Sequence, residues 1–342
     1  MKQKILISTG GTGGHVIPAI TIYEHLKNEH EVTICTDVRG LKYLDINKFK
    51  IFEIDTPKLN RSILLPFTIL KVFYLTIKSL LLLKKEKIQI LISTGGYMSL
   101  PLCLAGKILN IKIFLLEPNM TIGRANKFFL SFCEKIICYS NNINGLPNKF
   151  KKKIEISSPF IRRQYYEKKF KENNNEIFTI MIVGGSQGAQ IFDEIIHESI
   201  VKISKIKPLK IIHQTSQKKV NFFKKFYSEN NVENIVFNFD NNLDMLISQS
   251  DLCITRAGAS SLAEIAHLNV PFIAIPLPTS KDNHQLENAN YYRDKDCCWI
   301  INQKSFDRQK FQSLLLNILK NKDDLTKKKK ELRKFQLSKY LE

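Results

Sequence analysis

The sequence predicts an α/β protein with two Rossmann-like domains, and three observations support this. Short apolar runs of strand composition alternate with helical stretches throughout the chain, as in parallel sheets covered by helices. The 342 residues exceed the roughly 100–200 residues of one typical domain. In addition, Ile5–Ser8 and Ile180–Val183 each precede a glycine-rich turn and a helical pattern. The chain therefore contains the same beginning twice, once for each expected domain.

The predicted strands fall into two sets, with helical patterns in the intervals. The first set is Lys4–Ser8, Glu31–Thr36, Ile51–Ile54, Ile88–Ser93, Ile111–Leu116 and Lys135–Cys138. The second set is Phe178–Val183, Leu209–Gln214, Ile235–Phe239, Leu252–Thr255, Phe272–Pro276 and Cys298–Ile301. We therefore expect an N-terminal domain over 1–157, a C-terminal domain over 158–322 and a basic helix over 323–342. The polar stretch Lys168–Glu176 is predicted to be a surface loop near the boundary.

The chain is strongly basic, with a formal net charge of +20. Such a charge suits nucleic acid or an anionic membrane surface, but it also follows from a compositional bias seen in runs such as Lys149–Lys153 and Lys327–Lys330. No motif of the usual nucleic-acid-binding modules occurs, so we expect no nucleic acid partner. No apolar leader opens the sequence, which predicts a cytoplasmic location. The seven cysteines form no C-x-x-C pair, which predicts buried, reduced thiols without a zinc site, and we expect no cofactor.

Glycine-rich turns after predicted strands indicate phosphate binding, because backbone N–H groups and a helix N-terminus can approach an anion there. The turn at Gly10–Gly14 lacks the spacing of a dinucleotide site, since Val16 stands where glycine is required. A further glycine cluster follows at Thr94–Tyr97. The alternative is that these glycines only form tight packing turns. Pro18 is predicted to lie in the first helical turn, and Asp37 to be a turn residue at a strand end rather than a ribose-binding acid.

Two polar segments follow predicted strands of the second domain. In Arg256–Glu264, Ser260 and Ser261 can start a helix and donate to an anion. Glu264 can accept both hydroxyls of a ribose, although a carboxylate there also simply favours the helix dipole. In Pro276–Gln285, amide and imidazole groups suit sugar hydroxyls at the carboxyl end of a strand, although a solvated helix start has the same composition.

In order and spacing, these motifs resemble those of the MurG family. The matching segments are Gly10–His15, Gly95–Pro101, Glu117–Asn119, Gly184–Ala189, Arg256–Glu264 and Lys281–Gln285. The resemblance implies the B-type glycosyltransferase fold, in which two Rossmann-like domains face each other across a cleft. It also implies a peripheral enzyme at the cytoplasmic side of the inner membrane. That enzyme moves GlcNAc with inversion from UDP-GlcNAc to the C4 hydroxyl of MurNAc in lipid I, which gives lipid II for peptidoglycan synthesis.

The resemblance also implies roles for individual residues. For the donor these are Phe239 and Asp240 at the uracil, Glu264 at the ribose, Ser186, Ala259, Ser260 and Ser261 at the diphosphate, and Asn119, His284 and Gln285 at the sugar, with Arg162 and Arg256 as further binding residues. For the diphosphate of lipid I they are Gly11, Thr12, Gly13 and Gly14 in one loop and Gly95, Gly96 and Tyr97 in the other. The chain departs from the family at Pro118 and His284, where the family has Gln, and Arg162 stands one position late.

His15 is the candidate general base of the transfer. The reaction needs stabilisation of the departing diphosphate and a base for the attacking hydroxyl. His15 lies where the first glycine loop becomes a helix, and the positive helix end disfavours the imidazolium form. The alternative is that His15 only orders the loop or donates to an acceptor phosphate.

The segment 63–85 is strongly apolar but carries three lysines at seven-residue intervals, Lys71, Lys78 and Lys85. The two central lysines would each cost about 2.5–3.5 kcal/mol in a membrane span. The spacing places the three on one face, which predicts an interfacial helix at anionic lipid. The alternative is a helix packed in the domain, with its lysines reaching solvent. The resemblance favours the interfacial helix, and exchanging Leu75 and Leu82 for Glu is expected to weaken vesicle binding without unfolding.

Three other functions fit parts of the sequence. A nicotinamide-dependent oxidoreductase would use the same sheets, but the failed fingerprint at Val16 counts against it. A non-enzymatic basic protein would explain the charge, but not the clustered motifs. A related UDP-sugar transferase acting on another lipid-linked acceptor is distinguished only by the resemblance.

Overall fold

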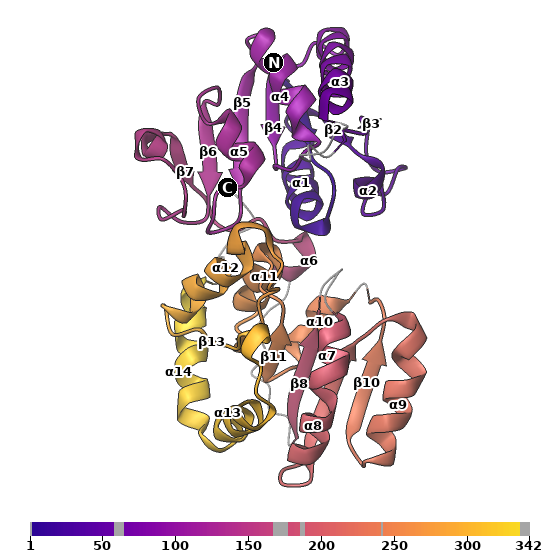
Figure 1. Cartoon of the computed structure of the whole chain (residues 1–342), viewed down its shortest axis with the longest axis vertical. Helices are drawn as coiled ribbons and strands as arrows, with labels where there is room; N and C mark the ends of the chain where they lie inside the picture. Colours follow the sequence, from indigo (N-terminus) through magenta and orange to yellow (C-terminus); the bar gives the residue numbers. More distant parts are fainter. Residues whose placement is uncertain (1, 58–64, 167–176, 185–188, 241, 336–342) are drawn as a thin grey trace. The chain divides into compact units, whose positions relative to one another are not determined.

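The computed structural model describes residues 2–57, 65–166, 177–184, 189–240 and 242–335 (Figure 1). The chain forms two compact units that meet between Arg162 and Arg163. Residues 158–162, which we expected in the second domain, belong to the first unit. There the Phe160 N–H donates to the Tyr139 hydroxyl (2.9 Å) and the Thr21 hydroxyl donates to the Ile161 carbonyl (3.3 Å). The predicted loop at Lys168–Glu176 lies outside the described residues.

The first unit is built on a parallel sheet with the strand order β3-β2-β1-β4-β5-β6-β7. Its strands are β1 Lys4–Ser8, β2 Glu31–Thr36, β3 Ile51–Glu53, β4 Ile90–Ser93, β5 Lys112–Glu117, β6 Lys135–Cys138 and β7 Ile154–Ile156. Consecutive residues of β1 and β2 are buried, as expected when helices cover both faces of a sheet. The predicted strands are present with shifted ends, but β7 was not predicted, because Glu155 interrupts its short apolar run.

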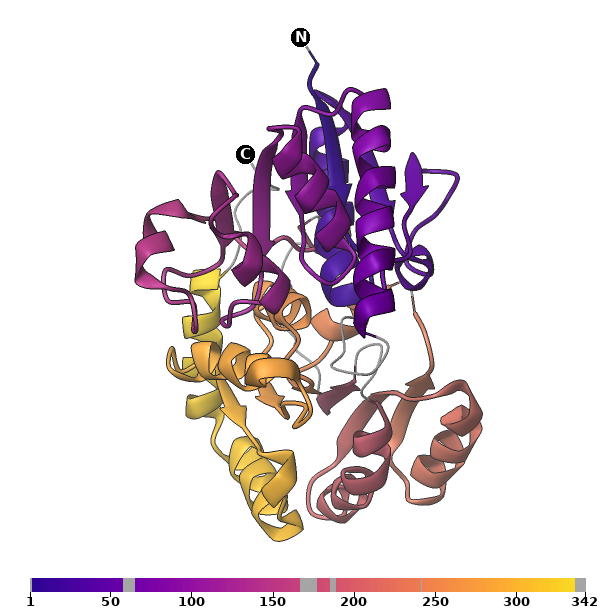
Figure 2. The ribbon, with the colours of Figure 1, turned by 45° about the horizontal axis from the view of Figure 1, so that its top comes forward.

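Helices connect these strands. They are α1 Gly13–Leu26, α2 Val38–Leu41, α3 Leu65–Lys85, α4 Ser99–Ile108 and α5 Arg124–Phe129, with the 3₁₀ helix η1 at Asn148–Lys153. The long helix α3 packs beside α4 (Figure 2). The prediction that Pro18 lies in the first turn of its helix is wrong. Because α1 already begins at Gly13, within the glycine loop, Pro18 falls in the second turn.

The second unit repeats the architecture with the parallel order β10-β9-β8-β11-β12-β13. Its strands are β8 Phe178–Val183, β9 Leu209–Gln214, β10 Glu233–Phe237, β11 Leu252–Thr255, β12 Phe272–Ala274 and β13 Cys298–Ile300. Its helices are α6 Arg163–Tyr166, α7 Ala189–Ile195, α8 His197–Ser204, α9 Val220–Glu229, α10 Leu243–Ser248, α11 Ala259–His267, α12 His284–Arg293, α13 Arg308–Lys320 and α14 Lys322–Leu332. Strand β10 ends at Phe237, two residues before its predicted end at Phe239, and the Phe239 side chain is 75% exposed.

Part of the basic helix predicted over 323–342 lies in α14, which ends at Leu332, and residues 336–342 lie outside the described residues. Helix α14 is anchored to the second unit by a buried lysine. The ammonium group of Lys328 lies 2.6 Å from the Asp296 carboxylate and 4.7 Å from the ring centroid of Trp299. Lys328 is only 5% exposed, so the charge is held by a carboxylate and an aromatic face rather than by water.

All seven cysteines are free and buried, as predicted. Burial raises the pKa of Cys103 and Cys138 to about 12, which suits inert thiols.

Candidate active site

Two glycine loops follow neighbouring central strands of the first-unit sheet, at the carboxyl ends of these strands. Strands β1 and β4 pair in parallel, and the direction of strand order changes between them. This is the position at which open α/β sheets bind ligands. Gly11 follows β1 with φ +81°, and Gly95 and Gly96 follow β4 with φ values of +90° and +84°. The hydroxyl of Thr94 donates to that of Thr9 at 2.8 Å, so the two loops are joined directly.

His15 lies against the second glycine loop. Its Nδ1 is 2.7 Å from the Thr94 carbonyl oxygen. A Cβ placed on Gly95 would lie 3.4 Å from the His15 ring, so the glycine permits this close approach. Because a carbonyl can only accept, Nδ1 carries the proton in the neutral ring, and Nε2 carries the lone pair. The structure thus brings together the candidate base and both predicted acceptor loops.

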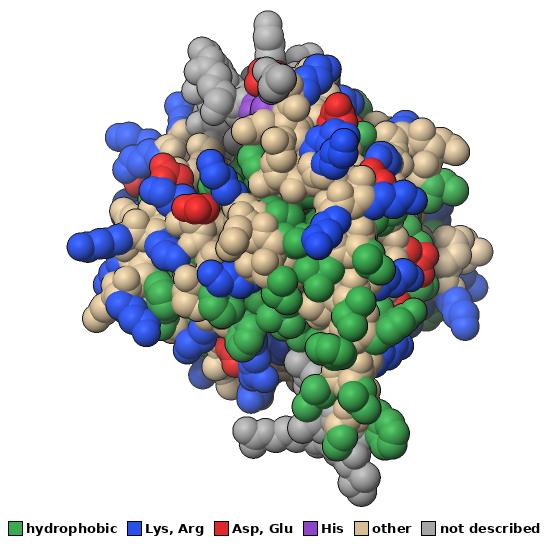
Figure 3. All heavy atoms as spheres, turned by 90° about the horizontal axis from the view of Figure 1, so that it is seen from above, with side chains coloured by type: hydrophobic (Ala, Val, Ile, Leu, Met, Phe, Trp, Pro, Cys, Tyr) green, Lys and Arg blue, Asp and Glu red, His purple; other side chains and the backbone are tan. Residues whose placement is uncertain are grey.

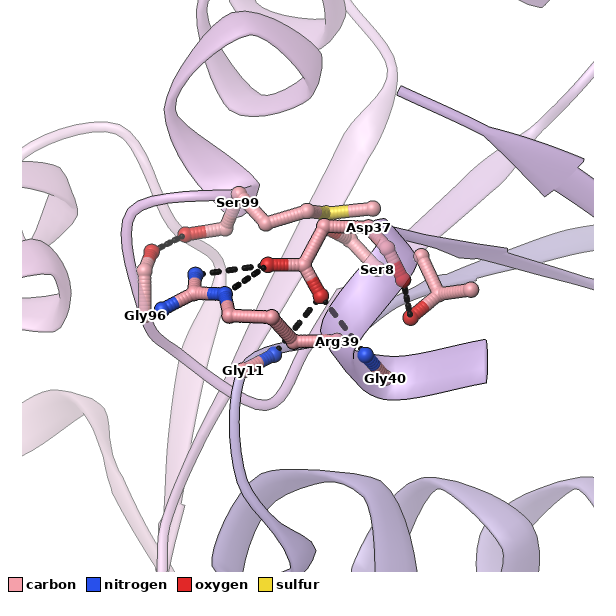
Figure 4. A network of polar contacts seen from close by, with 9 residues as sticks. Ser8, Gly11, Asp37, Arg39, Gly40, Gly96 and Ser99 are labelled. Carbon is pink, nitrogen blue, oxygen red and sulfur yellow. Dashed lines mark hydrogen bonds and ion pairs between the residues drawn. The ribbon is translucent and has the colours of Figure 1, made fainter. Parts of the chain in front are cut away.

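Asp37 connects the first glycine loop to helix α2 (Figure 4). One carboxylate oxygen accepts from Gly11 N (2.8 Å) and Gly40 N (2.9 Å). The other accepts from Arg39 Nε (2.9 Å) and Nη2 (2.6 Å). Burial acts to raise the pKa of Asp37, but these hydrogen bonds and the adjacent guanidinium outweigh it and hold the pKa below its usual range. Asp37 is therefore the strand-end turn residue that we predicted, and it also holds an arginine.

Glu117 orders the segment that follows β5. Its buried carboxylate accepts from Asn119 N (3.2 Å), Asn119 Nδ2 (3.0 Å), Gly123 N (2.7 Å) and Asn126 Nδ2 (3.0 Å). Complete burial raises the pKa of Glu117, although these donors oppose the rise. Asn119, a predicted sugar-binding residue, is thus fixed beside the loops that follow β4, since β5 pairs with β4.

In the second unit, the start of α11 has the features of an anion site. The helix begins at Ala259 after Gly258, with no acidic residue in its first turn and, among the described residues, no side chain capping its N-terminus. The Ser260 hydroxyl is buried and has no hydrogen-bond partner among the described residues. Ser261 lies beside it, and Glu264 follows on the same helix with 4% exposure. Free N–H groups, a spare hydroxyl and a carboxylate are therefore close together.

Arg256 and Gln285 make contacts inside the second unit. The Arg256 guanidinium donates to the Ile275 carbonyl (3.0 Å) and the Gln303 side-chain oxygen (2.7 Å), and burial lowers its pKa to about 10. The Gln285 side-chain oxygen accepts from Ala257 N (3.3 Å) and Leu277 N (2.9 Å). These contacts tie the loops after β11 and β12 to α12. The neighbouring His284 donates from Nδ1 to the Lys281 carbonyl at 2.8 Å.

Hydrogen bonds connect α7 with the segments that follow β9 and β10. Asp193, on α7, accepts from the Thr215 hydroxyl at 2.9 Å, and Asn238 Nδ2 donates to the Thr215 carbonyl at 2.9 Å. Phe239 and Asp240 follow directly after Asn238. The prediction for Ser186 concerns a residue outside the described part of the chain.

The structure places the predicted residues in two groups. The first group lies at the carboxyl ends of β1, β4 and β5 in the first unit and consists of His15, Asn119 and the glycine loops. The second group follows β11 and β12 in the second unit and consists of Ser260, Ser261, Glu264 and Gln285. Arg162 is the last residue of the first unit. Sequence patterns did not single out Arg39 or Gln303. The one available signal was Arg39's position two residues after Asp37, at a strand end.

Helix α3 exposes an apolar face. Large side chains exposed on it are Phe67, Ile69, Leu70, Phe73, Tyr74, Ile77 and Leu81, and Lys71, Lys78 and Lys85 are exposed as well. Figure 3 shows hydrophobic side chains gathered among Lys and Arg on this side of the molecule. Among the described helices, α3 is the one long and apolar enough to cross a membrane. The choice of Leu75 as a surface test position was wrong, since Leu75 is 6% exposed and faces the unit.

Comparisons with known proteins cover nearly the whole chain. The model of the glycosyltransferase family 28 N-terminal domain matches residues 5–138, and that of the C-terminal domain matches residues 179–341. The chain is 46% identical over 337 residues to a UDP-N-acetylglucosamine–N-acetylmuramyl-(pentapeptide) pyrophosphoryl-undecaprenol N-acetylglucosamine transferase of Pelagibacter ubique (strain HTCC1062), which spans 98% of this chain and 94% of the relative. A Rickettsia felis protein of the same name is 34% identical over 331 residues, spanning 93% of this chain and 91% of the relative. The crystal structure of Acinetobacter baumannii MurG superposes with a TM-score of 0.79 at 24% identity, over 98% of this chain and 96% of that one.

Proposed function

Because this chain belongs to the MurG family within glycosyltransferase family 28 and has its B-type fold, we propose that it transfers GlcNAc from UDP-GlcNAc to lipid I. The transfer forms a bond from the C4 hydroxyl of MurNAc to the anomeric carbon of GlcNAc with inversion. It releases UDP and gives lipid II for peptidoglycan synthesis. The likeness over nearly the full length of both chains carries this proposal.

We infer that the second unit binds the donor. The uncapped start of α11 and the unpartnered Ser260 hydroxyl support a diphosphate site. Glu264, on the same helix, would accept the ribose hydroxyls. Phe239, which is exposed in the loop after β10, would cover the uracil, beside Asp240. Arg256 and Gln285 would then act largely by holding the loops that present these groups, since their hydrogen bonds described above are with backbone groups and Gln303.

The first unit would bind the acceptor and supply the base. The N-terminus of α1 and the second glycine loop can stabilise phosphate charge through backbone N–H groups. His15 would take the proton of the attacking hydroxyl on Nε2 while Nδ1 remains bound to Thr94. The proton balance is then complete, because UDP leaves as an anion and the hydroxyl proton stays on the imidazole.

Release of UDP tests the proposed reaction. We expect release from UDP-GlcNAc only when a lipid I analogue is present, in step with formation of the disaccharide product. Reactions with UDP-glucose, and with an acceptor that carries an unrelated sugar on the same lipid diphosphate, serve as controls. No acceptor-dependent UDP release would reject the function, and faster transfer to the unrelated acceptor would favour a related transferase.

We propose that α3 docks on the cytoplasmic face of the inner membrane, with its exposed apolar side chains in the lipid and its lysines at anionic headgroups. Exchanging Phe73 and Leu81, each 65% exposed, for Glu should weaken sedimentation with vesicles of anionic phospholipid by about tenfold or more. The thermal unfolding midpoint should stay close to that of the wild type. The matched control is Ile206→Glu, an exposed apolar side chain in the second unit. Equal vesicle binding of the double variant and the control would contradict the proposal.

A further inference from the structure

We propose that Arg39, held in place by Asp37, is a ligand of the diphosphate group of the acceptor at the first glycine loop. The inference rests on the proposed function and names a residue that neither the motifs nor the family resemblance assigned. The ligand class is a diphosphate ester that carries negative charge on both phosphates.

Asp37 holds the Arg39 side chain in one position. Both Nε and Nη2 donate to one oxygen of Asp37, at 2.9 and 2.6 Å. The Asp37 side chain is fully buried, whereas that of Arg39 is 44% exposed. The buried carboxylate thus holds one edge of the guanidinium. The other edge, with Nη1, makes no hydrogen bond among the described residues and is open to an incoming anion.

The Arg39 guanidinium lies beside the first glycine loop. A Cβ placed on Gly11 would be 3.7 Å from Arg39 Nη2, so the cation lies directly beside the loop (Figure 4). Tyr43, one turn further on, lies against the same loop, because a Cβ on Gly13 would be 3.3 Å from its ring. The segment from Arg39 to Tyr43 therefore forms a wall along the glycine loop.

Only some hydrogen-bond donors around the first glycine loop remain for a phosphate. Gly11 N is already bound to Asp37, so this N–H cannot serve an anion. Within the described part of the chain, no side chain caps the start of α1, and the first turn of this helix contains no acidic residue. The donors proposed for the diphosphate are therefore the backbone N–H groups of Gly13 and Gly14 and the second edge of the Arg39 guanidinium, which lies beside Gly11. A planar guanidinium suits a diphosphate better than an ammonium does, because it can donate two parallel hydrogen bonds.

The test compares the acceptor KM of Arg39→Gln with that of Lys42→Gln, which removes the same charge from an exposed site just after α2. With a short-chain lipid I analogue, Arg39→Gln should raise the acceptor KM about 10- to 100-fold and leave the KM for UDP-GlcNAc unchanged. Arg39→Lys should recover part of this loss, since it restores the charge but not the planar edge. With an acceptor that carries the same sugar and peptide on an alkyl chain without the diphosphate, Arg39→Gln should raise the acceptor KM no more than Lys42→Gln does.

The outcomes separate this inference from the proposed function. If the wild type transfers GlcNAc but Arg39→Gln and Lys42→Gln have acceptor KM values within about twofold of each other, the inference is wrong and the function stands. Arg39 would have a purely structural role if Arg39→Gln raised the donor KM as much as the acceptor KM. The same conclusion would follow if it raised the KM of the acceptor without the diphosphate as much as that of the lipid I analogue. If the wild type transfers no GlcNAc, the proposed function itself fails.

Discussion

Replacing His15 with alanine is expected to lower kcat about 10²- to 10⁴-fold while leaving the KM for UDP-GlcNAc nearly unchanged. The reason is the tautomer that the structure imposes. The Thr94 carbonyl can only accept, so Nδ1 holds the proton and Nε2 can take one from the attacking hydroxyl. The measurement is steady-state UDP release at saturating donor and acceptor, repeated over a range of pH.

A second variant separates catalysis from loop ordering. The amide nitrogen of asparagine can take the place of Nδ1 and donate to Thr94, but asparagine has no group at the place of Nε2. His15→Asn should therefore be about as inactive as His15→Ala if His15 is the base. Recovery of activity in His15→Asn would instead mean that His15 only orders the second glycine loop. His25→Ala, near the end of the same helix, is the matched control and should keep wild-type kcat.

Replacing Glu117 with alanine is expected to lower the free energy of unfolding of the first unit by about 3 kcal/mol or more. The substitution removes a carboxylate that accepts hydrogen bonds from Asn119, Gly123 and Asn126, and the N–H groups that lose this acceptor are buried or partly buried. It also releases Asn119, so kcat/KM for UDP-GlcNAc should fall even at temperatures where the protein is folded.

Urea unfolding and donor kinetics measure the two effects of Glu117→Ala separately. The matched control is Glu155→Ala, which removes an exposed carboxylate in the same sheet, 3.2 Å from Lys135. An exposed ion pair of this kind contributes about 0–1 kcal/mol, so the control should unfold close to the wild type. If both variants unfold at the same urea concentration, Glu117 does not hold this segment together.

Much of the fold was predictable because buried parallel strands are continuous apolar runs. The doubling of the strand–glycine–helix pattern correctly predicted two sheets. Local signals failed where tertiary packing decides. The apolar run of strand β7 is short and interrupted by Glu155. Leu75 is as apolar as its exposed neighbours on α3, and it is buried only because it lies on the side of the helix that faces the unit. The start of α1 at Gly13, ahead of Pro18, depends on the loop geometry rather than on the proline.

The site was predictable only in part, for a related reason. Glycine spacing and the position of His15 are local properties of the sequence, and the structure places His15 against the second glycine loop. The contact of Asp37 with Gly11, and that of Arg256 with Gln303, join residues far apart in the chain. Nothing in the spacing of these residues indicates such partners. These contacts form because the order of the strands in each sheet determines which loops lie side by side.

The chain contains a single tryptophan, Trp299, and the Lys328 ammonium lies over its ring. When excited at a wavelength that tyrosine does not absorb, its indole emission is therefore an intrinsic optical signal from one position. A change in wavelength or intensity during titration with urea, salt or vesicles would report whether the terminal helix stays docked. The molecule thus carries its own fluorophore at the joint of α14, and no label has to be attached to follow it.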